Sequence, residues 1–420
     1  MIADLDITAI AAGGAGVARH EGLVVFVPRT APGDRVRAEI VPKGRFAQGR
    51  LREVTRASPK RIRPPCTHYE RDRCGGCQLQ HLTYDAQREA KGLIVRDALL
   101  RIGNRGVEVP YVHASPREWR YRNKLTLALR RSGETWIAGL HPYDAPGRIF
   151  PLEECPITED AVVALWHAIM AASRWLPHES ELRGAVRISD AGTSFVLEGG
   201  RRWAHHAQFF AAVSELGTLW WIPRGEERRL MQSRGDFGPT PAFAQVNPGV
   251  ADKLRDYVIE RVMAHRPASV IEAYAGEGEL AVALHARGVE VTTIEIDGES
   301  VERTRASLPA GTRVMKGRVE EQLHSALPAD AVILNPPRNG LHQRVTDLLS
   351  TALLGGESRP HPASRAPHPA LFYISCDAAT LSRDLRRLPN YQIASLVAFD
   401  MFPQTAHVET VCELVPGQGI

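Results

Sequence analysis

The sequence is poor in cysteine, with six in 420 residues, and it has no apolar stretch that approaches the length of a membrane-spanning helix. Six thiols are too few to cross-link a chain of this size, so their spacing favours metal binding or catalysis over disulfide bonds. The opening residues MIADLDITAI lack the basic flank and apolar core of a secretory signal. We therefore expect a cytoplasmic protein with no membrane partner.

The length and apolar content predict several domains. At 420 residues, with 44% apolar side chains, the chain can form two or three cores. Residues 1–58 alternate short apolar runs with glycine turns, a pattern that predicts a small β-barrel of the oligonucleotide-binding kind. A basic segment with paired prolines follows, and the prolines exclude a helix there.

Positive charge is concentrated near the start of the chain, although the formal net charge is only +4. Residues 35–63 contain ten Lys and Arg residues against two acids. A basic segment on a nearly balanced chain favours a polyanionic partner. Because no apolar face accompanies the charge, we expect nucleic acid rather than a membrane, with a solvated surface as the alternative.

The remaining sequence changes its pattern near residue 240. Helical spacing covers 80–102, whereas 111–235 has mostly the pattern of strands, with helices expected around 159–175 and 204–216. From about residue 240, apolar strands alternate with helices. This alternation predicts a doubly wound α/β domain with a mainly parallel sheet.

One segment has a composition of its own. Residues 355–370, GGESRPHPASRAPHPA, are poor in bulky apolar side chains and rich in Pro, Ser and His. We predict a mobile surface loop there. Metal binding by its two histidines is the weaker alternative.

A glycine turn marks a candidate cofactor site. VIEAYAGEGEL places Glu272 at a strand end, with Gly276 and Gly278 in the turn before a helix. Glycines there permit a tight turn and a ligand close to the backbone. Glu295, at the end of the next strand, can accept hydrogen bonds from two ribose hydroxyls. Both glycines with Ala281 also fit the dinucleotide pattern, so nicotinamide is the alternative, but the two acids and a later Asn-Pro-Pro favour S-adenosylmethionine.

Four cysteines have the spacing of a metal centre. CTHYERDRCGGC contains Cys66, Cys74 and Cys77, and the last two form a C-x-x-C pair that can chelate one centre. Cys155, in EECPI, is the candidate fourth thiolate. Four thiolates suit a 4Fe-4S cluster, with zinc as the weaker alternative. The spacing does not match the C-x3-C-x2-C of radical enzymes.

A fifth cysteine is a candidate nucleophile. Cys376 ends the apolar strand LFYISC, at the edge where α/β sheets place ligands, and the helix that follows favours a thiolate. Core packing is the alternative. Further on, FPQTAHVETV presents His407 and Glu409 on one side of an extended segment, so either could act as a base.

The segment VILNPPRNG raises the question of which atom is methylated. Asn335-Pro-Pro is the form used by enzymes that methylate exocyclic amines. Those enzymes have an aromatic residue after the prolines, whereas this chain has Arg338. They also need no thiol nucleophile, which would leave Cys376 and Glu409 without a role. We therefore expect methylation at carbon.

Together these segments resemble the uracil-C5 RNA methyltransferase family over almost the whole chain. The resemblance implies a TRAM-like RNA-binding barrel at 1–58, a central domain at 59–235 with a cysteine cluster, and an S-adenosylmethionine-dependent methyltransferase domain at 236–420. It also suggests that the helix at 80–102 packs on the catalytic domain. CGGCQLQH with Cys155 is similar to the iron–sulfur site of the family's ribosomal-RNA branch, which the transfer-RNA branch typically lacks. We therefore expect 23S ribosomal RNA as the substrate of a monomer that needs no protein partner.

The resemblance also assigns the site residues. SCDAATLSRDL makes Cys376 the nucleophile, and FPQTAHVETV makes Glu409 the acceptor of the C5 proton. The implied cofactor and base pocket consists of Gln245, Tyr274, Gly276, Gly278, Glu279, Glu295 and Asn335. The implied cluster ligands are Cys66, Cys74, Cys77 and Cys155.

One position departs from the family pattern. The family usually has Asp where this chain has Asn335, and the amide can pair with uracil or, when flipped, with cytosine. The alternatives are therefore transfer-RNA uracil-C5 methylation and RNA cytosine-C5 methylation. An RNA-binding assembly factor without catalysis is a third.

Overall fold

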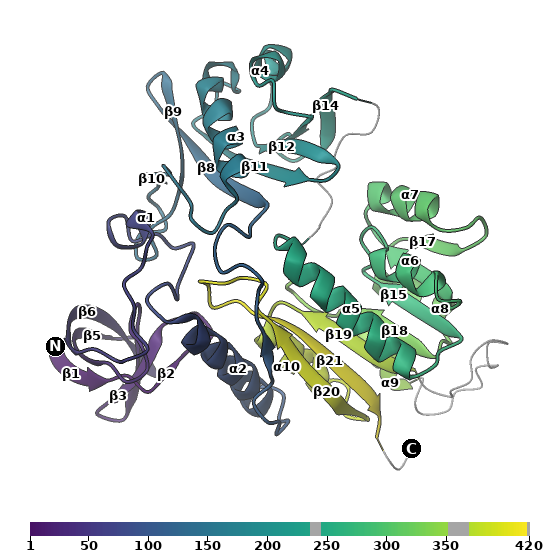
Figure 1. The fold of residues 1–420 in the computed structure, drawn as a ribbon, viewed down its shortest axis with the longest axis horizontal. Coiled ribbons are helices and arrows are strands. Elements are labelled where there is room, and N and C mark those ends of the chain that lie inside the picture. Colours follow the sequence, from purple (N-terminus) through teal and green to yellow (C-terminus); the bar gives the residue numbers. More distant parts are fainter. Residues whose placement is uncertain (236–244, 352–368, 418–420) are drawn as a thin grey trace.

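Three β-sheets follow one another along the chain in the computed structural model, which describes residues 1–235, 245–351 and 369–417 (Figure 1). The loop expected at 355–370 lies, up to residue 368, outside the described residues. No helix within the described ranges is long and apolar enough to cross a membrane.

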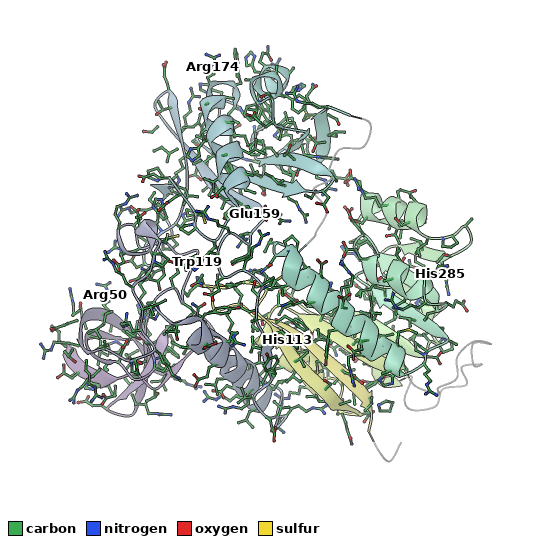
Figure 2. The ribbon with its side chains drawn as sticks, viewed as in Figure 1. Arg50, His113, Trp119, Glu159, Arg174 and His285 are labelled. Atoms are coloured by element: carbon green, nitrogen blue, oxygen red, sulfur yellow. The ribbon has the colours of Figure 1, made fainter. Side chains whose placement is uncertain are left out.

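The first sheet has the strand order β1-β5-β6-β4-β3-β2, with every neighbour antiparallel except the pair β4 and β6. Its strands are β1 (Ile2–Asp6), β2 (Ala9–Ile10), β3 (Gly16–His20), β4 (Leu23–Val27), β5 (Arg35–Pro42) and β6 (Phe46–Arg56). Val36 and Ala38 of β5 face a small apolar core, while Arg35 and Arg37, which alternate with them, are exposed. Arg50 of β6 is also exposed (Figure 2). The predicted alternation thus places the basic residues of this segment on its outer side.

Two helices connect the first sheet to the rest of the chain, namely α1 (Thr67–Glu70) and α2 (Tyr84–Arg101). The helix expected at 80–102 begins later than predicted, because the backbone of His81 and Leu82 pairs with the linker at Ile62 and Arg61 instead. Helix α2 packs beside the C-terminal part of the chain (Figure 1).

The second sheet has the order β10-β9-β8-β11-β12-β13-β14 and is antiparallel except between β12 and β13. Its strands are β8 (Lys124–Ser132), β9 (Thr135–Leu140), β10 (Phe150–Pro151), β11 (Glu181–Ser189), β12 (Gly192–Glu198), β13 (Thr218–Ile222) and β14 (Arg229–Ser233). Helices α3 (Asp160–Ala171) and α4 (His206–Ala212) and the 3-10 turn η1 (Ser173–Trp175) lie at the predicted interruptions. Leu125 and Leu127 of β8 face the core with α3. Lys124, the first residue of β8, therefore lies on the opposite face of the sheet.

The third sheet has the order β17-β16-β15-β18-β19-β21-β20-β7. Its strands are β15 (Ser269–Ala273), β16 (Glu290–Glu295), β17 (Arg313–Lys316), β18 (Ala331–Leu334), β19 (Ala370–Ser375), β20 (Tyr391–Phe399), β21 (Glu409–Pro416) and β7 (Val112–His113). The first five in spatial order are parallel, and β21 is antiparallel to both of its neighbours. The predicted α/β alternation is confirmed, with an antiparallel addition at one side.

Helices cover both faces of the third sheet (Figure 1). They are α5 (Pro248–Ala264), α6 (Glu279–His285), α7 (Gly298–Ser307), α8 (Val319–Ala326), α9 (Gln343–Thr351) and α10 (Ala378–Arg386). On β18, Ala331 and Ile333 pack in the core with α5 and α6, whereas Val332 and Leu334 pack in the core with α2, α8, α9 and α10. Continuous apolar strands are expected when both faces are buried.

Candidate active site

The predicted nucleophile and base lie opposite each other on neighbouring strands. Ser375, the last residue of β19, pairs with Thr410 of β21, and the Thr410 hydroxyl donates to the Ser375 carbonyl at 3.0 Å. Continuing this antiparallel register by one residue places Cys376 beside Glu409. Ile374, two residues before Cys376, and Val411, two residues after Glu409, pack in the same core with α5. The thiol and the carboxyl therefore leave the sheet on the same face.

Burial keeps both of these groups neutral. It raises the pKa of Glu409 to about 8, because the carboxyl is only 3% exposed. It also raises the pKa of the half-buried Cys376 thiol, and the carboxylate of Glu409 raises it further by repulsion. A charged Glu409 thus favours the neutral thiol, which suits a pair that works in succession rather than at the same moment.

Arg338 is close enough to act on both groups, and it acts in the opposite direction. Its guanidinium lowers the pKa of Glu409 and of Cys376, and it is a hydrogen-bond donor to the thiol. It also contributes to lowering the pKa of His407, after burial. Arg338 follows the Asn-Pro-Pro segment, but the sequence alone did not place it in the site. Only the sheet order, in which β19 lies between β18 and β21, brings it beside the nucleophile.

Asn335 belongs to the same edge and face. It follows Leu334 of β18, and the alternation of that strand directs residue 335 toward the α5 side, as for Cys376 and Glu409. Asn335 is half-buried, and its backbone N–H donates to the carbonyl of Ala273 of β15 at 3.3 Å. An amide, a thiol and a carboxyl from three neighbouring strands therefore meet at one sheet edge.

Gln245 lies in the segment just before α5, which contacts the loop that precedes Glu409. The residue after it, Val246, accepts a hydrogen bond from the backbone N–H of Asn123 at 3.0 Å. The next residue, the buried Asn247, donates from its side chain to the carbonyl of Met401 at 3.3 Å. Gln245 itself is half-buried. Its segment thus joins the second sheet to the loop that precedes Glu409.

Residues 400–408, here called the base loop, are held by the N-terminal part of the chain. Gln87 of α2 donates to the side chain of Gln404 and accepts from its backbone N–H, both at 2.9 Å. Lys91 of α2 forms a fully buried ion pair with Asp400 at 2.5 Å. The carbonyl of Gln404 accepts from the backbone of Gln78, next to Cys77, at 3.1 Å. The position of Glu409 therefore depends on residues about 320 positions away in the chain.

The predicted cofactor turn has the backbone that glycine permits. Gly276 and Gly278 have φ of +56° and +70°, in the left-handed region. A Cβ at Gly278 would lie 2.7 Å from Thr304, whereas Gly276 faces open space. Tyr274 is left-handed without being glycine, with φ of +60°, and its ring packs at the edge of the core below. Such backbone strain is typical of binding sites.

The acids around this turn have different roles in the structure. Glu295 accepts from the backbone N–H of Gly276 at 2.8 Å through one oxygen and from Ile296 and Asp297 through the other. One oxygen retains a free lone pair for a ligand hydroxyl. Glu272 is buried against the start of α6 and accepts from Ala281 at 2.7 Å.

Glu279 lies at the start of α6 and is exposed. It forms an ion pair with Arg255 of α5 at 2.5 Å. To contact the cofactor as predicted, the Glu279 side chain would have to turn away from Arg255.

The four predicted cluster cysteines gather in one place. Cys66 and Cys77 share a small buried core with Tyr69 and Tyr121, and Cys155 packs against it. Burial raises the pKa of every one of the four thiols, to about 11 for Cys74, and neighbouring thiols of the group raise it further for Cys74, Cys77 and Cys155. In the described residues no three His, Cys, Asp or Glu side chains form a group that could hold a metal ion.

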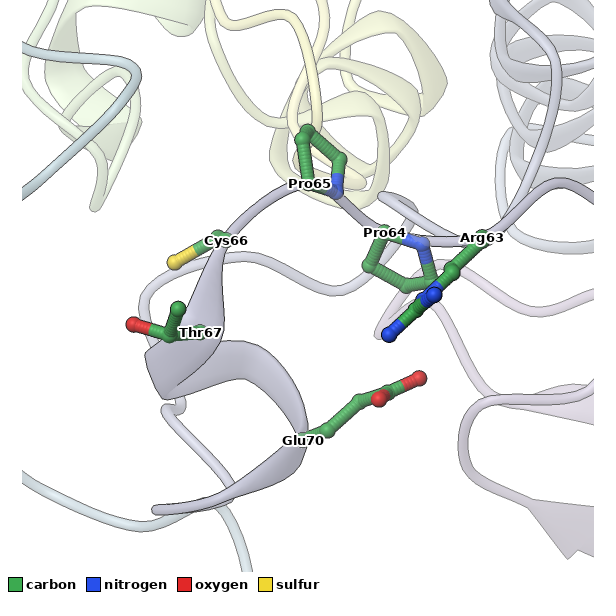
Figure 3. Close-up of a pocket in the computed structure, with 6 residues that line it drawn as sticks. All are labelled: Arg63, Pro64, Pro65, Cys66, Thr67 and Glu70. Carbon is green, nitrogen blue, oxygen red and sulfur yellow. The ribbon is translucent and has the colours of Figure 1, made fainter.

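A cavity of about 310 Å³ lies beside this cysteine group. Arg63, Pro64, Pro65, Cys66, Thr67 and Glu70 line it (Figure 3). The side chains of Arg63 and Glu70 point toward each other, and the Cys66 thiol points away from them. The cavity is therefore separate from the edge that carries Cys376.

Comparison with known proteins agrees with this geometry. No protein-family model matches the chain. The chain is 33% identical to an uncharacterized RNA methyltransferase of Gloeobacter violaceus over 97% of its own length and 95% of that protein. It is 30% identical to an uncharacterized RNA methyltransferase of Thermosynechococcus vestitus over 98% of its length and 97% of that protein.

Solved structures show a similar fold. The Pyrococcus abyssi tRNA (uracil-54, C5)-methyltransferase, in complex with S-adenosyl-L-homocysteine, matches 98% of this chain and 100% of its own with a TM-score of 0.68 at 22% identity. The mixed α/β methyltransferase fold is thus common to both. With relatives of 30% identity or more aligned over nearly the full length, the chain belongs to the RNA methyltransferases.

Proposed function

We propose that the protein methylates C5 of a uridine in RNA, with 23S ribosomal RNA as the substrate and S-adenosylmethionine as the methyl donor. The observation that carries the proposal is the placement of Cys376 and Glu409 side by side at the sheet edge, next to Asn335. Enzymes that methylate an amine need neither a thiol nor a second base.

The chemistry of C5 explains why both groups are needed. S-adenosylmethionine supplies the methyl group when bound. C5 of a pyrimidine is a weak nucleophile until the thiolate of Cys376 adds to C6 and makes an enolate. After C5 is methylated, Glu409 takes the C5 proton and the C6–S bond breaks, which restores both the ring and the thiolate.

The remaining groups bind and orient. Gln245 and Asn335 would hold the flipped base, since their amides can pair with its polar edge. The open turn at Gly276 and the free lone pair of Glu295 would hold the cofactor, and the backbone there fits a ligand close to the chain. The arginines of the first sheet, which we take as a TRAM-like barrel, would bind RNA phosphates.

The four gathered cysteines support a 4Fe-4S cluster. Each thiolate of such a cluster binds a different iron, so the sulfurs lie farther apart than ligands of a single ion, and thiols can gather without forming a single-ion site. Buried thiols with raised pKa values gain most from a cation that stabilises the thiolate form. Iron and sulfide analysis of anaerobically purified protein would test this, and stoichiometric zinc without iron would contradict it.

Transfer RNA is the second candidate substrate. A solved enzyme that matches the fold over its whole length is a tRNA (uracil-54, C5)-methyltransferase. The cysteine group is the observation that favours ribosomal RNA in this chain.

Tritium release distinguishes these possibilities. Transcripts of 23S ribosomal RNA and of transfer RNA, carrying [5-³H]uridine or [5-³H]cytidine, would be incubated with enzyme and S-adenosylmethionine. We expect release from uridine in the 23S transcript, and none with a Cys376→Ala variant. Tritium release from transfer RNA instead would make transfer RNA the substrate. Release from cytidine would make Asn335 a residue that determines base specificity. Methylation without tritium release would refute C5 chemistry.

A further inference from the structure

A group of cations on the second sheet surrounds Lys124, whose ammonium has no carboxylate partner within the described residues. Lys124 and Arg187 face each other across β8 and β11, on the sheet face opposite the α3 core. Arg122 lies beside them, since its side chain donates to the carbonyl of Lys124 at 2.9 Å. Arg183 of β11 lies on the same face and adds to the positive potential at Lys124.

This arrangement disfavours the charged form of Lys124. Its side chain is partly buried, and no carboxylate or hydrogen-bond acceptor contacts its ammonium within the described residues. Burial lowers its pKa, and the positive charges of Arg187, Arg122 and Arg183 lower it further. An ammonium held among like charges is costly unless an anion binds there.

The nearby carboxylates act electrostatically on Arg187 but not on Lys124. Glu277 and Glu279, in and after the glycine turn, stabilise the charge of Arg187. Neither of them contributes at Lys124. The uncompensated charge is therefore local to one side chain.

This cation group adjoins the proposed active site. Asn123, next to Lys124, donates its backbone N–H to Val246, the residue after Gln245. Arg122 is close enough to His407 of the base loop to lower its pKa. The electrostatic attraction between Arg187 and the glycine-turn acids places the third cation toward the cofactor side. The group thus lies between the base pocket and the cofactor turn.

We propose that Lys124, together with Arg122 and Arg187, binds a backbone phosphate of the RNA beside the nucleotide that enters the active site. The inference rests on the proposed function, because it takes RNA as the substrate. A phosphate has the negative charge and the acceptor oxygens that Lys124 lacks within the described residues, and arginine and lysine are the usual partners of phosphate. A nucleotide turned out of its stack needs its backbone held nearby.

The test measures RNA binding rather than methylation. Binding of a 5′-labelled 12-nucleotide oligouridylate would be followed over a range of KCl concentrations for wild type and for Lys124→Met. We expect Lys124→Met to bind about tenfold more weakly at low salt and its salt slope to be shallower by about 0.7, the value for one phosphate contact of a single strand. Lys124→Arg should keep most of the affinity.

Arg130→Met is the matched control, because Arg130 lies on the same strand and the same sheet face but already pairs with Glu181 at 3.2 Å. We expect it to bind like wild type. Melting temperatures would confirm folding, and Lys124→Met should be no less stable than wild type because an uncompensated charge is removed. If it fails to fold, Lys124→Gln replaces it.

Two results would overturn the proposal. One is an unchanged affinity and salt slope for Lys124→Met. The other is weaker binding of S-adenosylmethionine with intact RNA binding, which would assign the cations to the carboxylate of the cofactor. Failure of the C5 proposal is distinguishable, since tritium release would then be absent from wild type while the difference in oligouridylate binding persisted.

Discussion

At the scale of single residues, the buried carboxyl of Glu409 has conflicting requirements. It must be ionised to take the C5 proton, yet burial raises its pKa to about 8. A raised carboxyl pKa means that the ionised fraction, and with it proton removal, increases as pH rises toward 8 and is small below 7. We expect turnover to rise with pH over this range.

The Glu409→Gln variant separates the two steps of the proposed mechanism. The thiol can still add to C6, but the C5 proton stays, so we expect turnover to fall by about 10² to 10⁴ and an RNA–protein adduct to accumulate on denaturing gels. If the Glu409→Gln variant formed no adduct and turned over normally, Glu409 would be excluded as the base.

Stability gives an independent check on the same variant. Because folding raises the pKa of Glu409, this residue costs stability progressively as pH rises above its unfolded value of 4.5 and most above 8. Glu409→Gln should therefore stabilise the protein at pH 9 by on the order of 2 kcal/mol and leave it nearly unchanged at pH 5. Denaturant unfolding at both pH values measures the difference.

Arg338 should set the pH at which the pair works. Its charge lowers the pKa of Glu409 and Cys376, so Arg338→Met should shift the pH–rate profile upward by roughly one unit. Arg344→Met, at an exposed position in α9, is the control. Equal profiles for the two variants would show that Arg338 does not tune the site.

At the scale of elements, helix α2 holds the base loop in place. Gln87 makes two hydrogen bonds with Gln404, and Gln404 has an unfavourable φ of +69° that these contacts help to maintain. We expect Gln87→Leu to lower the free energy of unfolding by about 1–3 kcal/mol and to reduce kcat more than it raises KM for RNA. Arg96→Gln, on the half-exposed side of the same helix, is the control, and equal kcat values would contradict a positioning role.

At the scale of the whole molecule, the cysteine group joins segments that are distant in the sequence. Cys77 precedes Gln78, which contacts the base loop, while Cys155 comes from the second sheet's connections. We expect Cys155→Ser to lose iron and to lower the melting temperature, since a bound cluster stabilises the fold that holds it. Cys376→Ser should abolish turnover and keep both the iron and the melting temperature, and loss of iron from both variants would contradict the assignment.

Local patterns were enough to predict much of this protein. Each strand and helix of the α/β alternation, the glycine turn and the strand end at Cys376 is specified by neighbouring residues. Residue spacing alone therefore indicates the local backbone conformation. The same reasoning placed the start of a helix at residue 80, four residues before it begins at Tyr84. It failed there because pairing of His81 with Ile62, a contact beyond the local window, competes with the helix.

The sequence by itself determined which groups carry the proposed chemistry: a thiol, a carboxyl, an amide and a glycine turn in a fixed order. Only the tertiary structure decided that Cys376 faces Glu409, that Arg338 acts on both, and that Lys124 has no anionic partner within the described residues. These relations depend on strand register and sheet order, which join segments far apart in the chain. Charge and burial act through space, so the pKa of each group became defined only once its neighbours were in place.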